Sequence, residues 1–435
     1  MFSSQFSSQH GRHPVLPLRS RFVPSGEGSE GRHLAIGHLS IEGKFLGQGS
    51  YGKVLLHTSR EFDGKQVVKT VERPDGWSEK EMLHEAEIML EFDHPYILRL
   101  LSWYQEDAYS LCMVCDFCAG GEILEAVRQA RKTKPLPENW ASTVFRQLFD
   151  AMVYCHSRGV VHKDLKSDNI LLLNEVPAEC LFGVSPHAVV ADWGLAEVVN
   201  EGGFFSVKGH EIAGTSYTMA PEVWKGSCGQ KADIWSLGCV MFQILSNKIP
   251  FEPHENSMGG HSTKAKASLW TELHRRGPNW GWMMVSAEAL DLCKSMLVVK
   301  EKNRFRALQC RQHKWIEKHE AFGQSTKADG KRIADAVVQW HKRHPLQKAA
   351  CLRIATKFSK LSGPTKVFAT FDKDHNGYLS KQELQHLFQA YEVDTGLARG
   401  AVHHVDLKGT GELSFNEFLA ASLPALGEDF ATFVM

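Results

Sequence analysis

The chain has 435 residues, which is too long for one compact domain and predicts about two or three domains of roughly 150 residues each. Its 43% apolar and 10% aromatic residues can form a large core, so disorder of the whole chain is excluded. Lys and Arg (50) balance Asp and Glu (50), which argues against nucleic acid or an anionic membrane surface as the main partner.

No stretch reaches the roughly 18 to 20 uninterrupted apolar residues of a spanning helix, and the opening residues lack the apolar core of a secretion signal. We therefore expect a cytoplasmic protein with no membrane anchor. Ten cysteines are too few for a disulfide scaffold. Cys112, Cys115 and Cys118 have the CxxCxxC spacing of some metal sites, but no second ligand pair is nearby, so buried small side chains are the favoured interpretation.

Residues 1–38 are rich in Ser, Gly, His and Arg, and predict a disordered, mildly basic tail. Next, KFLGQGSYGKVLLHTS and KQVVKTV predict antiparallel strands, and WSEKEMLHEAEIMLEFDH predicts a helix that Pro95 closes. Three helical patterns follow: ENWASTVFRQLFDAMVYCHSRG, KADIWSLGCVMFQILSN and SAEALDLCKSMLVVKE. FGQSTKADGKR predicts a linker. Residues 39–317 thus predict a small β-rich lobe followed by a larger helical lobe.

The first motif with chemical meaning is the run GQGSYG, which lies between two strand-like segments. Glycines permit close backbone approach, so that amide N–H groups can cover phosphate oxygens; those of the motif are Gly47, Gly49 and Gly52. By itself, this glycine spacing also fits an ordinary turn with no role in binding. Its neighbours strengthen it, because Lys69 on the next strand can pair with phosphate oxygens. The following helix offers Glu85, or less favourably Glu87, to hold that ammonium group.

Three further motifs follow in the order HKDLKSDN (162–169), DWG (192–194) and APE (220–222). With the glycine-rich run and Lys69, they resemble the signature set of the eukaryotic protein kinases over about residues 41–317. The agreement of separate motifs in order and spacing leaves little room for chance. The resemblance implies a bilobal fold with a β-rich N-lobe and a helical C-lobe, and implies ATP and Mg2+ as cofactors.

Residue roles follow from this resemblance. Asp164 matches the base that orients the substrate hydroxyl, and Lys166 matches the residue that neutralises the transferred phosphoryl group. Asn169 and Asp192 match the two Mg2+ ligands, with the hard oxygen donors that this ion prefers. Lys166 and Thr215 resemble their counterparts in serine/threonine kinases.

Two structural assignments and two departures complete the kinase pattern. Asp233 resembles the helix residue that supports the catalytic loop, and Arg304 resembles the partner of Glu222. Lys163 stands where the family usually has arginine. Lysine keeps the positive charge but lacks the guanidinium group, which makes two hydrogen bonds to an activation-loop phosphate. We therefore predict that activity depends little on phosphorylation of the activation loop. Trp193 replaces the usual phenylalanine of DFG and leaves the metal-binding aspartate intact.

The segment MVCDFCAGGE resembles the part of a kinase that faces adenine. Cys115 takes the gatekeeper position, and this small side chain predicts an enlarged back pocket. Beyond the glycines, Lys69, Glu85 and Asp192, the residues implied to surround the nucleotide are Leu46, Val54, Asp116, Cys118 and Glu122. Glu122 and Asp168 also favour a basic residue upstream of the target Ser/Thr, with two solvated surface acids as the alternative interpretation.

The segment DKDHNGYLSKQE (372–383) fits the 12-residue EF-hand calcium loop at every ligand position. Gly377 makes the sharp turn, Tyr378 offers its backbone carbonyl, and Glu383 closes the site with both carboxylate oxygens. The remaining oxygen ligands are Asp372, Asp374, Asn376 and Ser380. This loop predicts a Ca2+ site.

A second loop, DLKGTGELSFNE (406–417), keeps only part of the pattern. Its candidate ligands are Asp406, Thr410, Glu412 and Glu417. Lys408, however, places a cation where Ca2+ needs an oxygen ligand, so we expect weak or no binding. The favoured role is structural pairing with the first loop through Leu379 and Leu413.

Residues 325–360 are basic and amphipathic. Two apolar stripes are predicted there, one of Ile333, Val337 and Trp340 and the other of Leu346, Ala350, Ile354 and Phe358. An EF-hand groove can capture such a helix, with two ordinary packing helices as the alternative. The order of kinase, basic helix and EF-hands (361–425) resembles the calcium-dependent protein kinases, in which the helix blocks the catalytic cleft at low Ca2+. That family usually carries four EF-hands, and two are visible here.

The sequence therefore predicts an α+β bilobal protein-kinase fold followed by an all-α EF-hand pair. The implied function is a Ca2+-regulated serine/threonine kinase with ATP, Mg2+ and Ca2+ as cofactors. Its expected partners are proteins with Ser/Thr near basic residues and its own junction helix, not nucleic acid. Two alternatives stay open: a Ca2+-sensing pseudokinase scaffold, which the intact set of Lys69, Asp164, Asn169 and Asp192 disfavours, and a kinase regulated by separate calmodulin.

Overall fold

The structure is a computed structural model that describes residues 44–49, 52–59, 64–73, 78–105, 109–199, 205–206, 214–253, 263–322, 325–355, 362–393 and 411–426. The chain divides into two compact units. Unit 1 comprises Met1–Asp93, Arg99–Phe117 and Ser325–Met435, and unit 2 comprises His94–Leu98 and Cys118–Gln324. The predicted tail, residues 1–38, lies outside the described residues. No helix in the described part of the chain has both the length and the apolar character needed to cross a membrane.

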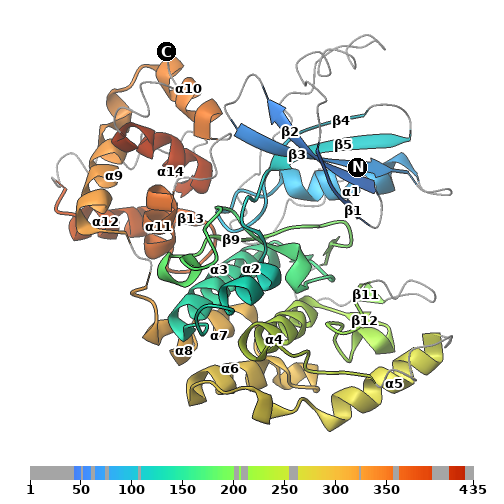
Figure 1. Ribbon diagram of the computed structural model, residues 1–435. Coiled ribbons are helices and arrows are strands. Elements are labelled where there is room, and N and C mark those ends of the chain that lie inside the picture. The colour runs from blue at the N-terminus through green and yellow to red at the C-terminus, as the bar shows by residue number, and fades with distance from the viewer. Residues whose placement is uncertain are drawn as a thin grey trace. The chain divides into compact units, whose positions relative to one another are not determined.

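Unit 1 begins with a five-stranded antiparallel sheet (Figure 1, blue to cyan). Its strands are β1 (Lys44–Gly49), β2 (Gly52–Ser59), β3 (Gly64–Glu72), β4 (Leu100–Gln105) and β5 (Ser110–Asp116), in the order β1-β2-β3-β5-β4. A small apolar cluster of Val68, Cys112 and Val114 lies between β3 and β5. This sheet is the predicted β-rich lobe.

Helix α1 (Glu79–Leu90) packs against β4 and β5. It begins with a capping box in which Ser78 accepts from the backbone N–H of Glu81 and Glu81 accepts from the N–H of Ser78. The prediction that the helix runs to Pro95 was wrong. It ends at Leu90, and the chain then continues through buried, non-helical residues that include Asp93.

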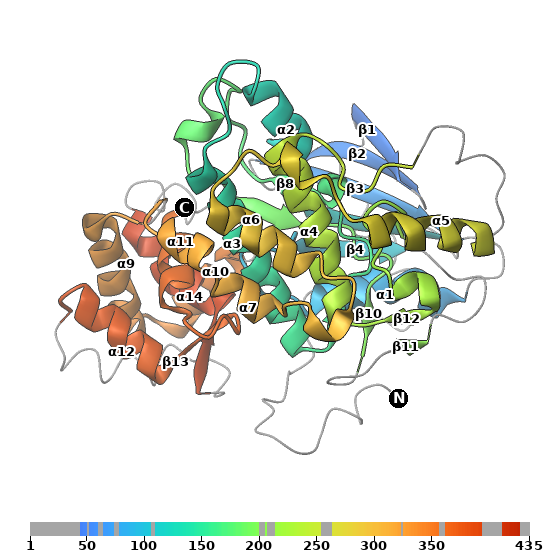
Figure 2. The ribbon, with the colours of Figure 1, turned by 90° about the horizontal axis from the view of Figure 1, so that it is seen from below.

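Unit 2 contains the helical lobe. Its long helices α3 (Glu138–Ser157) and α4 (Gln230–Ser246) are buried over most of their length and contact each other (Figures 1 and 2). Both helices carry apolar residues on most of their faces, and the buried Asp150 of α3 accepts from Arg311. The other helices of this unit are α2 (Ile123–Ala130), α5 (Thr263–Arg276), α6 (Ala287–Met296), α7 (Ala307–Arg311) and α8 (Lys314–Lys318).

Short strand pairs hold the loops of unit 2. A three-stranded sheet has the order β6 (Gly121–Glu122), β8 (Ile170–Leu172) and β9 (Ala188–Val190). Two further pairs in the described part of unit 2 are β7 (Val160–Val161) with β10 (Glu197–Val198), and β11 (Phe205–Ser206) with β12 (Ser227–Cys228). These pairs fix the segments that carry the HKDLKSDN, DWG and APE motifs.

The C-terminal part of unit 1 is a helical module around one apolar core. Among the described residues, its helices are α9 (Lys327–Gln339), α10 (Pro345–Ala355), α11 (Ser362–Phe371), α12 (Lys381–Ala390) and α14 (Phe415–Ser422), and its strands are β13 (Tyr378–Ser380) and β14 (Glu412–Ser414) (Figure 1, orange to red). Leu379 pairs with Leu413 across the two strands, which confirms the predicted contact between the two loops.

Two predictions for residues 322–355 need correction. The second half of the predicted linker lies inside α9, because Thr326 caps that helix by accepting from the N–H of Asp329 at 3.1 Å. The first predicted apolar stripe is buried as expected. Of the second, Ile354 packs partly buried against the core and Phe358 lies outside the described residues, but the other two members are exposed. Leu346 is 75% exposed and Ala350 is also exposed, whereas Cys351 and Ala355 form the buried face of α10.

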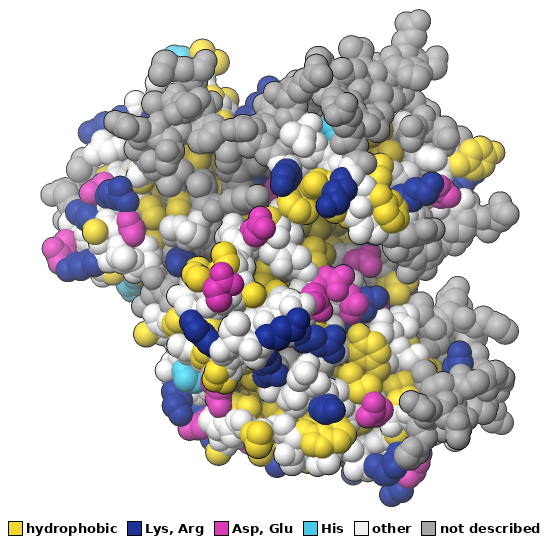
Figure 3. Space-filling model, viewed as in Figure 1, with side chains coloured by type: hydrophobic (Ala, Val, Ile, Leu, Met, Phe, Trp, Pro, Cys, Tyr) yellow, Lys and Arg dark blue, Asp and Glu magenta, His cyan; other side chains and the backbone are white. Residues whose placement is uncertain are grey.

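On the face shown in Figure 3, side chains of Lys and Arg are interspersed with those of Asp and Glu. This mixture agrees with the equal numbers of basic and acidic residues in the chain. No large single-sign field, of the kind that attracts nucleic acid, arises from such a mixture on this face.

Candidate active site and calcium site

The glycine-rich hairpin and the predicted Lys69–Glu85 pair lie in unit 1. Gly47 and Gly49 are on β1, and Gly52 begins β2; Leu46 is 42% exposed and Val54 is half-buried. At position 52 a Cβ atom would lie 1.5 Å from the carbonyl oxygen of Thr70, so the pairing of β2 with β3 requires glycine there.

Lys69 on β3 donates from Nζ to both carboxylate oxygens of Glu85 on α1, at 2.7 and 2.9 Å. Glu85 is 8% exposed, whereas Glu87 lies on the exposed side of the helix. The predicted choice of Glu85 over Glu87 is therefore confirmed. A partly buried, bidentate pair of this kind holds the ammonium group in one place.

The segment that follows the sheet carries the predicted nucleotide-facing residues. Asp116 ends β5, where its Oδ2 accepts from Nε of Arg99 at 3.2 Å. Cys112 and Cys115 on β5, and Cys118 in unit 2, are all buried, as expected of small core side chains.

Unit 2 brings together the predicted catalytic residues Asp164, Lys166, Asn169 and Thr215. Oδ1 of Asp164 accepts from the backbone N–H of Thr215 at 2.8 Å and from its hydroxyl at 2.7 Å. Oδ2 accepts from Nζ of Lys166 at 3.1 Å. Asn169, in the 3-10 turn Ser167–Asn169, donates from Nδ2 to the carbonyl of Asp164 at 2.8 Å. Donors thus fix both oxygens of the carboxylate.

Asp233 on α4 holds the loop that presents Asp164. Its Oδ2 accepts from the backbone N–H of His162 at 2.9 Å, and its Oδ1 accepts from that of Lys163 at 3.0 Å. Burial by itself would raise the pKa of Asp233, but hydrogen bonding from His156 and His162 holds the pKa below its usual value. The predicted support of the catalytic loop by this helix residue is confirmed.

The DWG motif lies against the same loop. Trp193 is fully buried, and its ring centroid lies 4.5 Å from that of His162. The preceding residue, Asp192, has a φ of 64° in the left-handed region and an exposed side chain. Tryptophan therefore fills the space under the loop while the aspartate carboxylate stays accessible. Asn169 and Asp192 supply oxygen donors that suit Mg2+.

Two ion pairs anchor the segment between DWG and APE. Arg304 donates to both oxygens of Glu222, with 2.9 Å from Nη2 to Oε2, as predicted. Nζ of Lys163 donates to Oε1 of Glu197 at 3.0 Å. Sequence analysis missed Glu197, because the two-residue pairing of β7 with β10 that brings it near Lys163 has no sequence signal.

Acidic groups surround the start of α2. Burial raises the pKa of Glu122 above its ordinary value, and the carboxylates of Asp168 and Glu125 raise it further. Tyr217 donates to Oδ2 of Asp168 at 3.4 Å, and burial followed by this carboxylate raises the pKa of Tyr217 to about 12. Glu122 and Asp168 therefore share one negatively charged region of unit 2.

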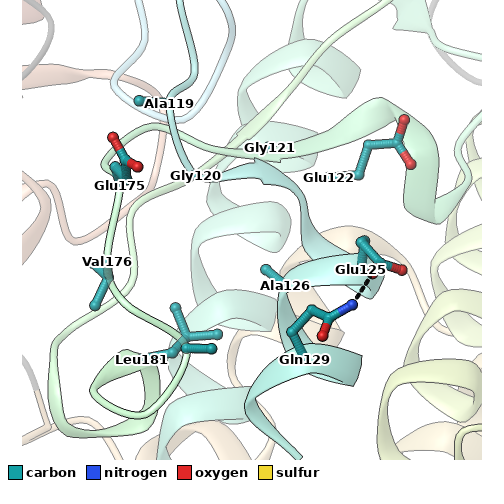
Figure 4. Close-up of a pocket in the computed structure, with 11 residues that line it drawn as sticks. Ala119, Gly120, Gly121, Glu122, Glu125, Ala126, Gln129, Glu175, Val176 and Leu181 are labelled. Carbon is teal, nitrogen blue, oxygen red and sulfur yellow. Dashed lines mark hydrogen bonds between the residues drawn. The ribbon is translucent and has the colours of Figure 1, made fainter.

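A cavity of about 280 Å3 extends this acidic region (Figure 4). Small and apolar residues of α2 and of the loop after β8, including Ala126, Val176 and Leu181, line it. Glu122 and Glu175 lie on opposite sides of it in the view of Figure 4, and Glu125 accepts from Gln129 at 2.5 Å. Carboxylates from both segments thus border an apolar hollow.

The first EF-hand loop places its acidic ligands together in unit 1. One carboxylate oxygen from each of Asp372, Asp374 and Glu383 lies within 4.8 Å of the others. Backbone N–H groups of Asn376 and Gly377 donate to the two oxygens of Asp372 at 3.1 and 3.0 Å. Gly377 has a φ of 81°, which the sharp turn requires. The oxygen-rich donor set fits Ca2+.

The other predicted ligands lie around these three. The backbone N–H of Tyr378 donates to Oδ1 of Asn376 at 2.7 Å, and Tyr378 begins β13. Ser380 caps α12 in a capping box with Glu383, whose Oε1 also accepts from the N–H of Lys373 at 2.7 Å. Glu383 is thereby fixed at the closing position of the loop, as its predicted role demands.

Only the end of the second loop falls within the described residues. The candidate ligands Asp406 and Thr410 lie outside them. Glu412 is half-buried on β14, and Glu417, 3% exposed, forms a capping box with Ser414 at the start of α14. Whether this loop binds Ca2+ stays a prediction.

Together, the β-rich lobe, the helical lobe with its Asp164 loop and the paired acidic loops define a protein kinase domain followed by an EF-hand pair. Residues 41–316 match the protein kinase domain, and residues 365–423 match the EF-hand domain pair. The chain belongs to the protein kinase family.

Curated relatives bear names from one branch of that family. Calcium-dependent protein kinase 5 of Plasmodium berghei (strain Anka) is 29% identical over 387 residues, covering 87% of this chain and 64% of that protein. Calcium-dependent protein kinase 5 of Plasmodium falciparum (isolate 3D7) is 28% identical over 386 residues, covering 87% and 63%. The chain thus spans slightly less than two thirds of the length of these relatives, and the predicted resemblance to the calcium-dependent protein kinases is confirmed.

Proposed function

We propose that this protein is a Ca2+-regulated serine/threonine protein kinase that transfers the γ-phosphoryl group of ATP to hydroxyl groups of protein substrates. The network around Asp164 carries the proposal. Donors at 2.7 to 3.1 Å from Thr215 and Lys166 fix both carboxylate oxygens, so the group is oriented before substrate arrives. A pre-oriented carboxylate can accept the substrate hydroxyl's hydrogen bond and orient its oxygen for attack.

The remaining roles are distributed over both units. Lys69, held by Glu85, is assigned to the ATP phosphates, and Lys166 offsets the negative charge of the transferred group. Asn169 and Asp192 are assigned to Mg2+, which when bound neutralises charge on the phosphates. The hydrogen bond from Nδ2 of Asn169 to the carbonyl of Asp164 fixes the amide group, which supports the assignment of its Oδ1 to Mg2+.

Calcium control is proposed to act through the C-terminal module. Ile333 and Val337 on α9, and Trp340 directly after it, lie in one core with the EF-hand helices, and α10 adds Cys351 and Ala355. This packing supports capture of the junction segment by the EF-hand pair. Sensor loops of this type respond to about 10⁻⁷ to 10⁻⁵ M Ca2+. Blockage of the catalytic site at low Ca2+ stays a prediction.

The preferred substrates are proposed to carry a basic residue upstream of the Ser/Thr. The support is the acidic region formed by Glu122 and Asp168 and extended by Glu125 and Glu175 around the cavity of Figure 4. Opposite charge favours binding of a Lys or Arg side chain there. Double replacement of Glu122 and Asp168 by Gln and Asn should raise the KM for a basic peptide more than that for a neutral peptide.

The decisive test is phosphorylation of a Ser/Thr peptide library containing basic residues, measured against Ca2+ concentration. Asp164→Asn should lower kcat by roughly 10²- to 10⁴-fold, because it removes a positioned base while keeping the shape of the side chain. Equal turnover by wild type and Asp164→Asn would contradict the kinase assignment and favour a scaffold. A requirement for added calmodulin would instead favour regulation by that separate protein.

A further inference from the structure

The ion pair between Lys163 and Glu197 joins the catalytic loop to the segment that follows DWG. Nζ of Lys163 and Oε1 of Glu197 lie 3.0 Å apart, and their side chains are 12% and 42% exposed. The pair is reinforced by the backbone, because Glu197 pairs with Val161 across β10 and β7. The bond therefore spans two residues that local strand pairing already holds close.

Lys163 needs such an anchor because its backbone is strained. Its φ of 73° lies in the left-handed region, which costs a long side chain on the order of 1 kcal/mol or more. The surrounding structure holds this conformation in two ways. Asp233 accepts from the backbone N–H, and Glu197 accepts from the side chain. The next residue is Asp164, so the backbone conformation of Lys163 sets the direction in which the Asp164 side chain projects from the loop.

The surroundings of Lys163 already contain several negative charges. Burial raises the pKa of the Cys228 thiol on β12, and the carboxylates of Asp233, Glu222 and Glu197 raise it further, whereas Lys163 lowers it. Glu222 is paired with Arg304, and Glu197 supplies a carboxylate directly to Lys163.

We infer that Glu197 is a positioning residue, whose permanent negative charge orders the catalytic loop through Lys163 in place of a phosphate group. The inference rests on the proposed kinase function and specifies how that function is regulated. It assigns activity to the unphosphorylated chain, with the required anion built into β10. It also explains how lysine can stand at position 163, since a single carboxylate needs no bidentate partner.

The test uses the full chain, treated with phosphatase, in Ca2+ and saturating peptide. Glu197→Gln should lower kcat about fivefold, which is the rate change expected from the loss of a partly exposed ion pair at the upper end of its usual strength. The KM for ATP should change less than twofold. Glu197→Asp should recover most of the lost rate. Glu317→Gln, an equal change of charge at an exposed residue of α8, should leave kcat unchanged. A kcat for Glu197→Gln within 1.5-fold of wild type, roughly the assay error, would overturn the inference.

Two further measurements separate this inference from the kinase assignment. If the two residues act as a pair, Lys163→Met and the double variant with Glu197→Gln should be equally slow. Additive losses would show that Glu197 acts by another route and overturn the inference. Amide hydrogen exchange of residues 159–166 should be faster in Glu197→Gln. That readout needs no turnover, so an inactive wild type would reject the kinase function while exchange still decides whether Glu197 orders the loop.

Discussion

His274 on α5 is a base enclosed by aromatic rings. It is 2% exposed, and its ring centroid lies 4.9 Å from that of Trp235 and 4.8 Å from that of Phe251. Within the described part of the chain, neither ring nitrogen has a hydrogen-bond partner. Burial lowers the pKa of His274 to about 3, and the nearby positive charges of Arg304 and Lys225 act in the same direction. The residue is therefore neutral in the folded protein.

This histidine should make unit 2 sensitive to acid. As pH falls below the ordinary value of 6.5, unfolded His274 binds a proton and the folded residue does not until about pH 3. Its contribution to stability is thus complete above pH 6.5 and decreases by about 1.4 kcal/mol for each lower pH unit, or about 2 kcal/mol at pH 5. His274→Leu should lose less stability than wild type between pH 7.5 and 5. Urea unfolding followed by tryptophan fluorescence would measure this, and equal losses in both proteins would contradict it.

At the scale of the element, β13 and β14 connect the two EF-hand loops. Leu379 is fully buried and Leu413 is 1% exposed, and the two face each other across the strands. The sequence predicted this contact because both leucines occupy the same position of a 12-residue loop. The buried face of α10 was not predictable in the same way. Pro345 starts a new helix, so the phase of the apolar pattern on α9 does not continue into it.

Leu413→Ala should weaken Ca2+ binding at the first loop although it replaces no ligand there. Removal of a buried leucine side chain costs about 2 to 5 kcal/mol, and much of that loss falls on the strand pair that holds Tyr378 and Ser380. Calorimetric titration with Ca2+ should show an affinity at least about tenfold lower, equivalent to about 1.4 kcal/mol. Leu346→Ala, at an exposed position of α10, is the matched control and should bind as wild type does.

Glu383→Gln tests the first loop directly. The substitution removes the charge of the closing ligand but keeps a side chain that can accept from Ser380 and Lys373. Loss of one of three clustered carboxylates should lower Ca2+ affinity by at least about tenfold, since Ca2+ prefers charged oxygen ligands. Thermal unfolding with and without Ca2+ should then show a smaller shift in Tm than for wild type. An unchanged shift would place the ion elsewhere.

At the scale of the whole molecule, unit 1 contains both the β-rich lobe and the EF-hand module, joined by buried polar contacts. Both carboxylate oxygens of Asp93 accept from the backbone N–H of Asn416, at 3.2 and 3.4 Å, in the first turn of α14. Arg99 donates to the carbonyl of Ala355 at 2.8 Å, at the end of α10, and also to Asp116. Motif spacing does not reveal these contacts, because they join residues hundreds of positions apart.

Under the proposed calcium control, these contacts connect the EF-hand module to the β-rich lobe. Asn416 lies just after β14, which pairs with β13 of the first loop, so this strand pair connects the predicted Ca2+ site to the amide that Asp93 holds. Asp93→Ala leaves this buried N–H without its acceptor, at a cost of about 1 to 2 kcal/mol. The ratio of peptide phosphorylation with and without Ca2+ should therefore fall at least about fivefold. Glu87→Ala, on the exposed side of α1, should keep the wild-type ratio.

Arg99→Met should act in the same direction as Asp93→Ala, because it removes the hydrogen bond to α10. An unchanged ratio in both would show that calcium reaches the kinase without these contacts.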